Sequence, residues 1–370
     1  MRISLALVTA LLTAAAPALG AEKPSPPSDP APASTAAKSD VQPTAADFAK
    51  EHPSANEIVT ATFAPGHFNR ALLTRIQILL DRAHFGPGVI DGMPGENLDN
   101  AVRAYKRSQG LADDAAFDEE TWRRLSQPDS APALVAYTVT DEDVAGPFTK
   151  DIPAKMEEQA ELPRLAYRGP GELLSERFHM GQAFLQDVNK GKDLEQAGTV
   201  IQVANVATAL DPTDARAAGR TIAETRKRDP ERPKAARIIV DKPGHLVTAL
   251  DASGKVLAVY PASIGSTEKP APSGTLKVVR VAPNPSYTYN PDYAFKGVKT
   301  HKAFEIKPGP NNPVGAVWIQ LTGEGYGIHG TPEPDKVGKT ASHGCVRLTN
   351  WNALELAGMV EKGVTVEFGE

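Results

Sequence analysis

The sequence contains only one cysteine, Cys345, in 370 residues. It has no Walker-type phosphate loop, no dinucleotide-binding glycine pattern and no paired cysteine motif for zinc. The 40 Lys and Arg nearly balance the 45 Asp and Glu, which gives a formal net charge of -5 and a pI near 6.0. The chain therefore lacks the basic excess that is typical of nucleic-acid binding, and it lacks the common nucleotide and zinc motifs.

The N-terminal apolar run is too short to cross a bilayer, which takes ~20 residues. It follows Arg2 and leads to small residues at Ala18 and Gly20, the pattern of a cleaved signal peptide. We expect residues 1–20 to be removed after Gly20 and the protein to be exported to the periplasm or cell envelope, without stable membrane insertion. Ala21 stands where a lipid-modified cysteine would be needed, so we expect no lipid anchor; an uncleaved signal anchor is the alternative.

The lone cysteine is unusual for an exported protein. Structural cysteines in oxidising compartments come in pairs, and one cysteine cannot form an intrachain disulfide. Three interpretations of Cys345 remain: a buried small apolar residue, an intermolecular bridge, or a reactive nucleophile.

Three segments have the composition of connecting chain. The stretch after the signal peptide is rich in Pro, Ala and Ser and cannot bury enough apolar surface to order itself, so we expect a disordered tether over residues 21–60. We expect linkers at residues 131–162 and 211–233.

Residues 61–130 have apolar side chains at helical spacing, from Leu72, Ile76 and Leu80 in the first helix to Trp122 in the third. This segment resembles the three-helix peptidoglycan-binding domain, whose signature it matches at Asp91, Gly92, Gly95, Ala101, Val102, Gly110 and Leu111. The resemblance implies glycan binding, and a three-helix spacer is the alternative.

Residues 163–210 contain two short helical patterns, one with Leu174 and Phe178 and one with Phe184 and Leu185, followed by a turn and an alternating strand. This order resembles a degenerate LysM module, a small βααβ glycan-binding unit. The resemblance implies a small α+β module that also binds the wall polymer.

From Lys234 onward the apolar period changes to two. Turn sequences such as KPG and ASGK separate β-rich runs, as in consecutive hairpins. One amphipathic helix comes late, in NWNALELAGMV, with Thr349 or Asn350 as its cap. We expect residues 234–370 to form a mostly-β, largely antiparallel domain with one late helix.

A thiol with an ordinary pKa of ~8.5 is mostly protonated at neutral pH, so a reactive cysteine needs a base or a positive partner. His343 lies two residues before Cys345, and His329 ends the apolar run GYGIH. If that run is a strand, His329 can lie beside the thiol across a sheet. Each histidine alone is more often a core or surface residue, and a zinc site of these three residues matches no common finger spacing.

Three neighbouring residues fit the same chemistry. Gly344 lets the backbone turn so that amide N–H groups face the space in front of sulfur, as an oxyanion hole requires. Gly330 leaves its carbonyl free to orient the imidazole of His329. Arg347 offers a forked donor for a substrate carboxylate, although an isolated arginine is more often a surface charge.

The joint pattern IHGT and SHGCVRLTN resembles the L,D-transpeptidase catalytic domain of the YkuD type, from about residue 234 to the C-terminus. The resemblance implies that Cys345 is the nucleophile, that His329 is the general base and that the Gly330 carbonyl orients this base.

Other motif positions imply further roles. His343 and Gly344 match the oxyanion region, and Arg347 and Ser342 match positions that bind the stem peptide. The implied reaction is a ping-pong acyl transfer on peptidoglycan stem peptides through a thioester, with no cofactor and no metal. The acyl acceptor would be another stem peptide or an envelope protein.

Two alternatives remain open. One is a hydrolase on the same scaffold, either an L,D-carboxypeptidase or an amidase that uses water as the acceptor. The other is a catalytically silent wall-binding protein. The insert over residues 282–315 is either a lid over the acceptor side or a structural loop.

Overall fold

The computed structural model describes residues 45–207, 233–266, 270–291, 300–340, 342 and 344–369. Several expected features lie outside these residues: the signal peptide, most of the tether, nearly all of the second linker, and His343. Residues 43–370 form one compact unit. None of the described helices combines the length and apolarity needed to span a bilayer.

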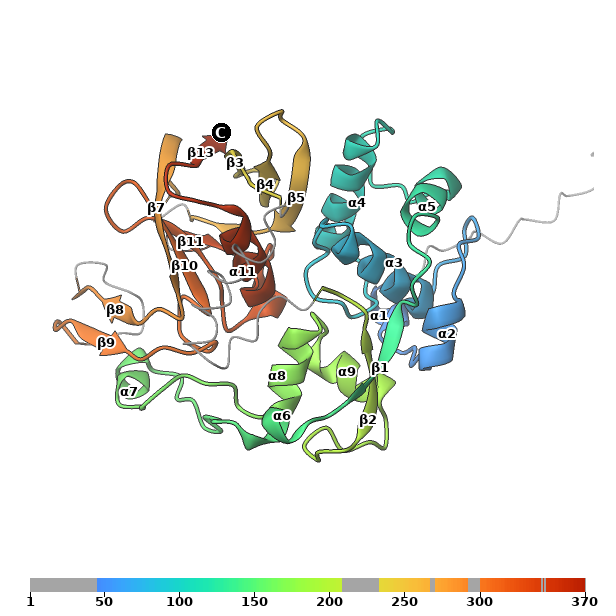
Figure 1. Ribbon diagram of the computed structural model, residues 1–370, viewed down its shortest axis with the longest axis horizontal. Helices are drawn as coiled ribbons and strands as arrows, with labels where there is room; N and C mark the ends of the chain where they lie inside the picture. The colour runs from blue at the N-terminus through green and yellow to red at the C-terminus, as the bar shows by residue number, and fades with distance from the viewer. Residues whose placement is uncertain are drawn as a thin grey trace, which may run out of the picture. The chain divides into compact units, whose positions relative to one another are not determined.

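The first part of the described chain is helical (Figure 1). Its helices are α1 (Ala45–Phe48), α2 (Ala55–Thr60), α3 (Arg70–Arg82), α4 (Glu96–Ser108) and α5 (Glu119–Ser126). The last three are the helices expected from the apolar spacing. Their inner faces share one core, which contains Leu72, Ile76, Leu80, Leu98, Val102 and Leu125.

Ordered structure begins earlier than the sequence indicated, so the expected tether over residues 21–60 is too long. Ser54 caps α2 by accepting a hydrogen bond from the Glu57 N–H, and the Glu57 carboxylate accepts one from the Ser54 N–H. Ile58 of the same helix is fully buried. A capping box and one buried side chain order this short segment despite its polar composition.

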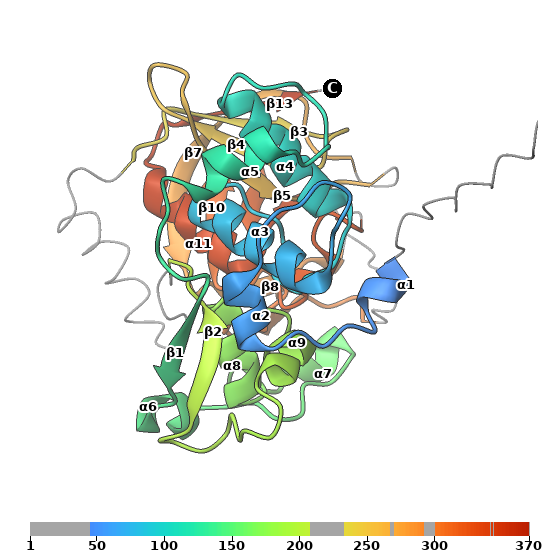
Figure 2. The ribbon, with the colours of Figure 1, turned by 90° about the vertical axis from the view of Figure 1, so that its right-hand side faces the viewer.

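The middle of the chain forms a two-stranded sheet with helices beside it (Figure 2). Its elements are β1 (Leu134–Thr138), α6 (Asp141–Ala145), α7 (Met156–Ala160), α8 (Pro170–Arg177), α9 (Gln182–Val188) and β2 (Val200–Ala204). β1 and β2 pair antiparallel along their full lengths. The expected linker 131–162 is therefore wrong over β1, α6 and α7. The LysM-like interpretation of residues 163–210 stays a prediction.

The C-terminal part is the mostly-β domain that the sequence predicted. Its main sheet runs in the order β5-β4-β3-β13-β7-β10-β11-β12-β6. These strands are β3 (Arg237–Asp241), β4 (Leu246–Leu250), β5 (Val256–Pro261), β6 (Ser263–Ile264), β7 (Gly274–Pro283), β10 (Val317–Leu321), β11 (Gly327–His329), β12 (Val346–Arg347) and β13 (Thr365–Gly369). In this sheet only β3–β13 and β11–β12 are parallel pairs.

A single described helix of this part, α11 (Asn350–Met359), packs against β10 and β11 (Figure 1). Thr349 is its cap, because its hydroxyl accepts a hydrogen bond from the Asn352 N–H. The insert over residues 282–315 contains a hairpin of β8 (Tyr287–Tyr289) and β9 (Phe304–Ile306). A short 3-10 helix, η2 (Pro334–Lys336), precedes the cysteine loop.

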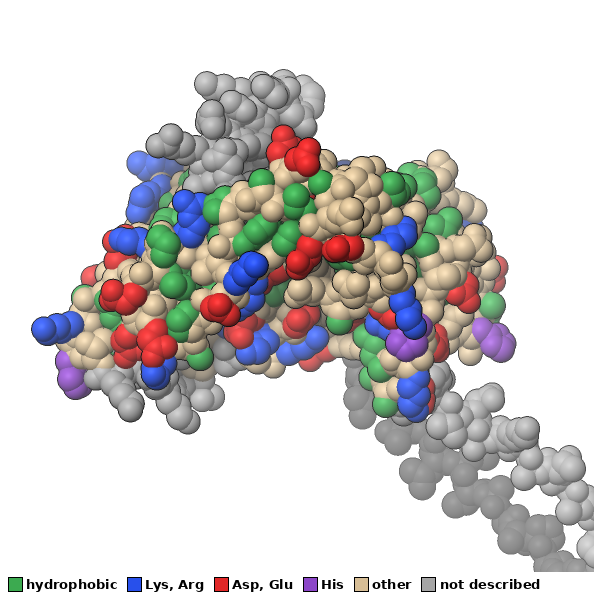
Figure 3. All heavy atoms as spheres, turned by 90° about the horizontal axis from the view of Figure 1, so that it is seen from below, with side chains coloured by type: hydrophobic (Ala, Val, Ile, Leu, Met, Phe, Trp, Pro, Cys, Tyr) green, Lys and Arg blue, Asp and Glu red, His purple; other side chains and the backbone are tan. Residues whose placement is uncertain are grey.

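Contacts join the helical and middle parts to the β domain. The Gly86 N–H donates to the Val259 carbonyl of β5, and the Asn350 side chain of α11 donates to Glu176 of α8. On the face shown in Figure 3, basic and acidic side chains are interspersed, as the near balance of charge leads one to expect.

Candidate functional site

Neighbouring strands bring the two halves of the sequence motif together. β11 and β12 pair in parallel, with Ile328 opposite Val346 and His329 opposite Arg347. Cys345 directly precedes β12, so the thiol and the imidazole come from adjacent strands. The expectation that GYGIH ends in a strand at His329 is confirmed.

His329 is a neutral, fixed base. Its side chain is buried, and its Nδ1 lies 2.6 Å from the Gly330 carbonyl oxygen. Because a carbonyl only accepts, Nδ1 carries the proton and the lone pair is on Nε2. Burial, with the charge of Arg347 as the second cause, lowers the pKa of His329 to about 3, and the bond to Gly330 opposes this shift. The ring is also stacked on Trp318, with centroids 5.5 Å apart.

The Cys345 thiol is partly buried and faces the turn before β11. Sγ donates to the Gly325 carbonyl oxygen at 3.5 Å. Burial raises the pKa of Cys345, while the Gly327 backbone and the charge of Arg347 act against this rise. Within the described residues Sγ makes no hydrogen bond to His329. The raised pKa of Cys345 and the lowered pKa of His329 both favour the neutral forms of these side chains at neutral pH.

The loop before the cysteine is tied to the end of β6. Ser342 is 2% exposed; its hydroxyl donates to the Cys345 carbonyl and accepts from the Gly265 N–H at 2.7 Å. The hydroxyl of Ser342 is thus used inside the loop, and the expected contact of Ser342 with substrate stays a prediction. Gly344 has φ 99°, a left-handed conformation that favours glycine, and it directs the chain into Cys345.

Arg347 carries a charge beside the site. It lies on β12 next to His329 and is partly buried, and its Nε has no hydrogen-bond partner in the part of the chain that the structure describes. Burial lowers the pKa of Arg347, but a guanidinium keeps its proton in proteins. Its unused donor suits a carboxylate ligand.

Two residues near His329 were not singled out as site residues from the sequence. Trp318 of β10 lies opposite His329 in the register, and its ring covers Gly327, where an added Cβ would come within 2.4 Å of the indole. Asn350 packs its side-chain oxygen against Gly330. Asn350 is the last residue of the motif SHGCVRLTN, so the motif could have identified it as a site residue. For Trp318 the sequence offered no indication beyond its place in an expected strand.

Across the described residues no group of three or more His, Cys, Asp or Glu side chains is placed to hold a metal ion.

Two regions of the chain match known families. Residues 235–367 match YkuD, the "L,D-transpeptidase catalytic domain", and residues 69–125 match PG_binding_1, the "Putative peptidoglycan binding domain".

Individual relatives agree with these matches. The Bacillus subtilis (strain 168) protein named "Putative L,D-transpeptidase YkuD" is 28% identical over 123 residues, 33% of this chain and 60% of that protein. The protein of the same organism named "Putative L,D-transpeptidase YqjB" is 34% identical over 136 residues, 35% of this chain and 68% of its own length. The solved structure of an L,D-transpeptidase from Mycobacterium smegmatis is 23% identical, with a TM-score of 0.31, and the match covers 37% of this chain and 59% of that one. The match to YqjB, at 34% identity over 68% of that protein, and the match of residues 235–367 to the catalytic-domain family show that this chain belongs to the L,D-transpeptidase family with a YkuD-type catalytic domain.

Proposed function

We propose that the protein cross-links peptidoglycan by L,D-transpeptidation with Cys345 as the nucleophile. Sulfur attacks the carbonyl carbon that joins an L-centre to a terminal D-residue, and its proton passes to Nε2 of His329. The amide C–N bond breaks, the departing D-amino acid takes that proton, and a thioester remains on sulfur. An acceptor amine then attacks the thioester, forms the new amide and returns a proton to sulfur.

The state of His329 carries this proposal. The ring is buried and neutral, and its Nδ1–H is directed at the Gly330 carbonyl, which leaves the Nε2 lone pair to accept a proton. Cys345 is a neutral thiol whose pKa is raised by burial, so it depends on a base to become nucleophilic. Membership of the family and the adjacency of β11 and β12 support the same assignment.

The surrounding residues receive roles that follow from their chemistry. Gly344 and His343 would shape the oxyanion region through the backbone in front of sulfur. Arg347 would bind a carboxylate of the stem peptide, for which its unused donor is suited. Ser342 would hold the cysteine loop in place through its two hydroxyl bonds.

Wall retention is the proposed task of the N-terminal parts. The match of residues 69–125 to a peptidoglycan-binding domain supports it, and the β1–β2 segment is a second candidate through its LysM-like order of elements. Holding the enzyme on the polymer raises the local substrate concentration. The acceptor would be a second stem peptide or an envelope protein. Export by a signal peptide at residues 1–20 would bring the enzyme to this substrate.

The test is intact-mass detection of a covalent adduct after incubation with a tetrapeptide stem, with and without an added amine. The wild type should gain the mass of the peptide minus its terminal D-residue, and Cys345→Ala should gain none. His329→Ala should slow acylation at least ~100-fold, with partial recovery at pH values where the thiol ionises unaided. The exposed His301 provides a matched control, since His301→Ala should acylate at the wild-type rate.

Two results would change the assignment. An adduct that persists in Cys345→Ala would rule out this nucleophile. An acyl-enzyme that turns over equally fast without an amine would make the protein a hydrolase of the same family.

A further inference from the structure

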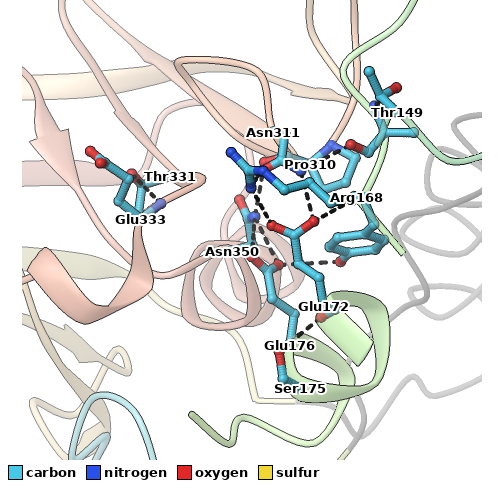
Figure 4. Close-up of polar contacts among 12 residues, drawn as sticks. Thr149, Arg168, Glu172, Ser175, Glu176, Pro310, Asn311, Thr331, Glu333 and Asn350 are labelled. Carbon is cyan, nitrogen blue, oxygen red and sulfur yellow. Dashed lines mark hydrogen bonds and ion pairs between the residues drawn. The ribbon is translucent and has the colours of Figure 1, made fainter. Parts of the chain in front are cut away.

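Glu176 is a buried carboxylate outside the catalytic domain. It lies on α8 of the middle segment and is 7% exposed. The Asn350 side-chain amide donates to both of its oxygens, at 2.9 Å and 3.3 Å, and the Tyr167 hydroxyl donates to one of them at 3.2 Å (Figure 4). No ion pair to Glu176 occurs among the described residues. A buried carboxylate held only by neutral donors is unusual and calls for a physical explanation.

The surroundings of Glu176 favour its neutral form. Burial raises the pKa of Glu176 to about 8, and the nearby Glu172 carboxylate adds to the rise, while the hydrogen bonds from Asn350 and Tyr167 oppose it. Arg168 does not neutralise Glu176, because its guanidinium is paired with Glu172. At neutral pH the group is therefore mainly a protonated acid whose oxygens accept hydrogen bonds.

Asn350 connects this acid to the catalytic base. Its side-chain oxygen accepts from the Ala316 N–H at 2.9 Å. The same oxygen packs against the backbone of Gly315 and Gly330, where an added Cβ on either glycine would lie 2.2 Å from it. The amide of Asn350 therefore fills the space behind Gly330. The Gly330 carbonyl is the group that accepts from Nδ1 of His329.

The loop before Ala316 is fixed from the same side. The Pro310 carbonyl accepts from the Asn350 amide at 3.2 Å. Asn311 donates through its side chain to the Ala166 carbonyl and to Glu172, and its N–H donates to the Leu165 carbonyl. Figure 4 shows Glu176 of α8 facing Asn350 at the start of α11, and Glu172 of the same helix facing Asn311 in the loop. The middle segment thus contacts the residues behind Gly330 directly.

We propose that Glu176 is a positioning residue for the transpeptidation: it anchors the Asn350 amide, which holds Gly330 so that its carbonyl fixes the tautomer of His329. This role rests on the proposed function and adds to it a requirement for the middle segment in catalysis. Without the anchor, the Pro310 carbonyl is the one acceptor left for the Asn350 side-chain N–H groups among the described residues, so the amide is held less firmly. The Gly330 carbonyl then loses its support, and part of the protein carries the His329 proton on Nε2. Nε2 is the nitrogen whose lone pair must accept the thiol proton, so this tautomer cannot act as the base.

The test compares two variants in the full-length protein. Glu176→Met keeps the volume of the side chain but removes both acceptor oxygens, whereas Glu176→Gln keeps one. The exposed Glu158 of α7 gives a matched control, Glu158→Met. Nitrogen-15 NMR of the imidazoles reports the tautomer of His329 without substrate, with its signals assigned by their loss in His329→Gln. Acylation by the stem peptide gives a saturating rate and a half-saturating concentration.

We expect the Nδ1–H tautomer of His329 in the wild type and in Glu176→Gln. In Glu176→Met we expect a mixture of the Nδ1–H and Nε2–H tautomers. The saturating acylation rate of Glu176→Met should fall about 10-fold, as for a misplaced base, with an unchanged half-saturating concentration. Retention of the wild-type tautomer in Glu176→Met would overturn the proposal whatever the activity. A loss in Glu176→Gln as large as in Glu176→Met would also overturn it. Absence of acylation in the wild type would refute the proposed function, while the tautomer still tests the positioning role.

Discussion

Glu176→Gln should change how the stability of the protein depends on pH. In the folded protein the pKa of Glu176 is about 8, against an ordinary value of 4.5. Between these pH values the folded protein keeps a proton that the unfolded chain has released. The free energy of unfolding therefore falls as pH rises through this window. The stability that the retained proton of Glu176 contributes is fully present below pH 4.5 and is lost by about pH 8.

The size of the effect follows from the same two pKa values. Each pH unit inside the window lowers the free energy of unfolding by about 1.4 kcal/mol, which reaches about 5 kcal/mol by pH 8. The cause is the burial of an acid that no cation neutralises among the described residues, next to Glu172. A glutamine at this position has no proton to lose, so it removes the pH-dependent loss.

The measurement is urea denaturation of the wild type, Glu176→Gln and the exposed control Glu158→Gln at pH values from 4.5 to 9. All groups other than residue 176 are common to the wild type and Glu176→Gln and cancel in their difference, whereas Glu158→Gln reports the effect of removing an exposed carboxylate. The wild type and Glu176→Gln should differ little at pH 4.5 and diverge steadily toward pH 8, with Glu176→Gln the more stable. Parallel curves for these two proteins would show that Glu176 is ionised when folded and would refute the argument from burial.

Three further predictions concern the site itself. Alkylation of Cys345 by iodoacetamide, followed by intact mass, should keep accelerating above pH 9, because burial raises the pKa of this thiol; a plateau below pH 8 would contradict this. Ser342→Ala should slow acylation about 10-fold through loss of two loop hydrogen bonds, whereas Ser342→Thr, which keeps the hydroxyl, should be less affected. Gly330→Ala should lower the free energy of unfolding by about 3 kcal/mol in urea denaturation, because its Cβ would lie 2.2 Å from the Asn350 side-chain oxygen; an unchanged midpoint would contradict this packing.

Local patterns in the sequence were sufficient for several features of this protein. The change of apolar period near Lys234 predicted the mostly-β domain, and the helical spacing of Leu72, Ile76 and Leu80 predicted the first of three helices. The motif around Cys345 predicted the family, which the comparisons confirm. These inferences succeed because strand period, helix period and a short motif each depend on residues close together in the chain.

Features made by distant residues were missed or misjudged. β1 was taken for linker because its partner β2 lies more than sixty residues later, and a short strand has little pattern of its own. The support that Ser342 gives to the cysteine loop depends on Gly265, which is 77 residues away.

The chemical state of the site was decided by tertiary structure alone. The sequence supplies a histidine and a thiol. The lowered pKa of His329 and the raised pKa of Cys345 come from burial, which no local pattern encodes. The contact of Glu176 with Asn350 joins residues 174 positions apart, and only the packing of α8 against α11 creates it. The sequence by itself thus predicted the candidate reacting groups, Cys345 and His329, and the strand that ends at His329. The folded structure decided their protonation and what holds them in place, because both depend on which distant atoms exclude water.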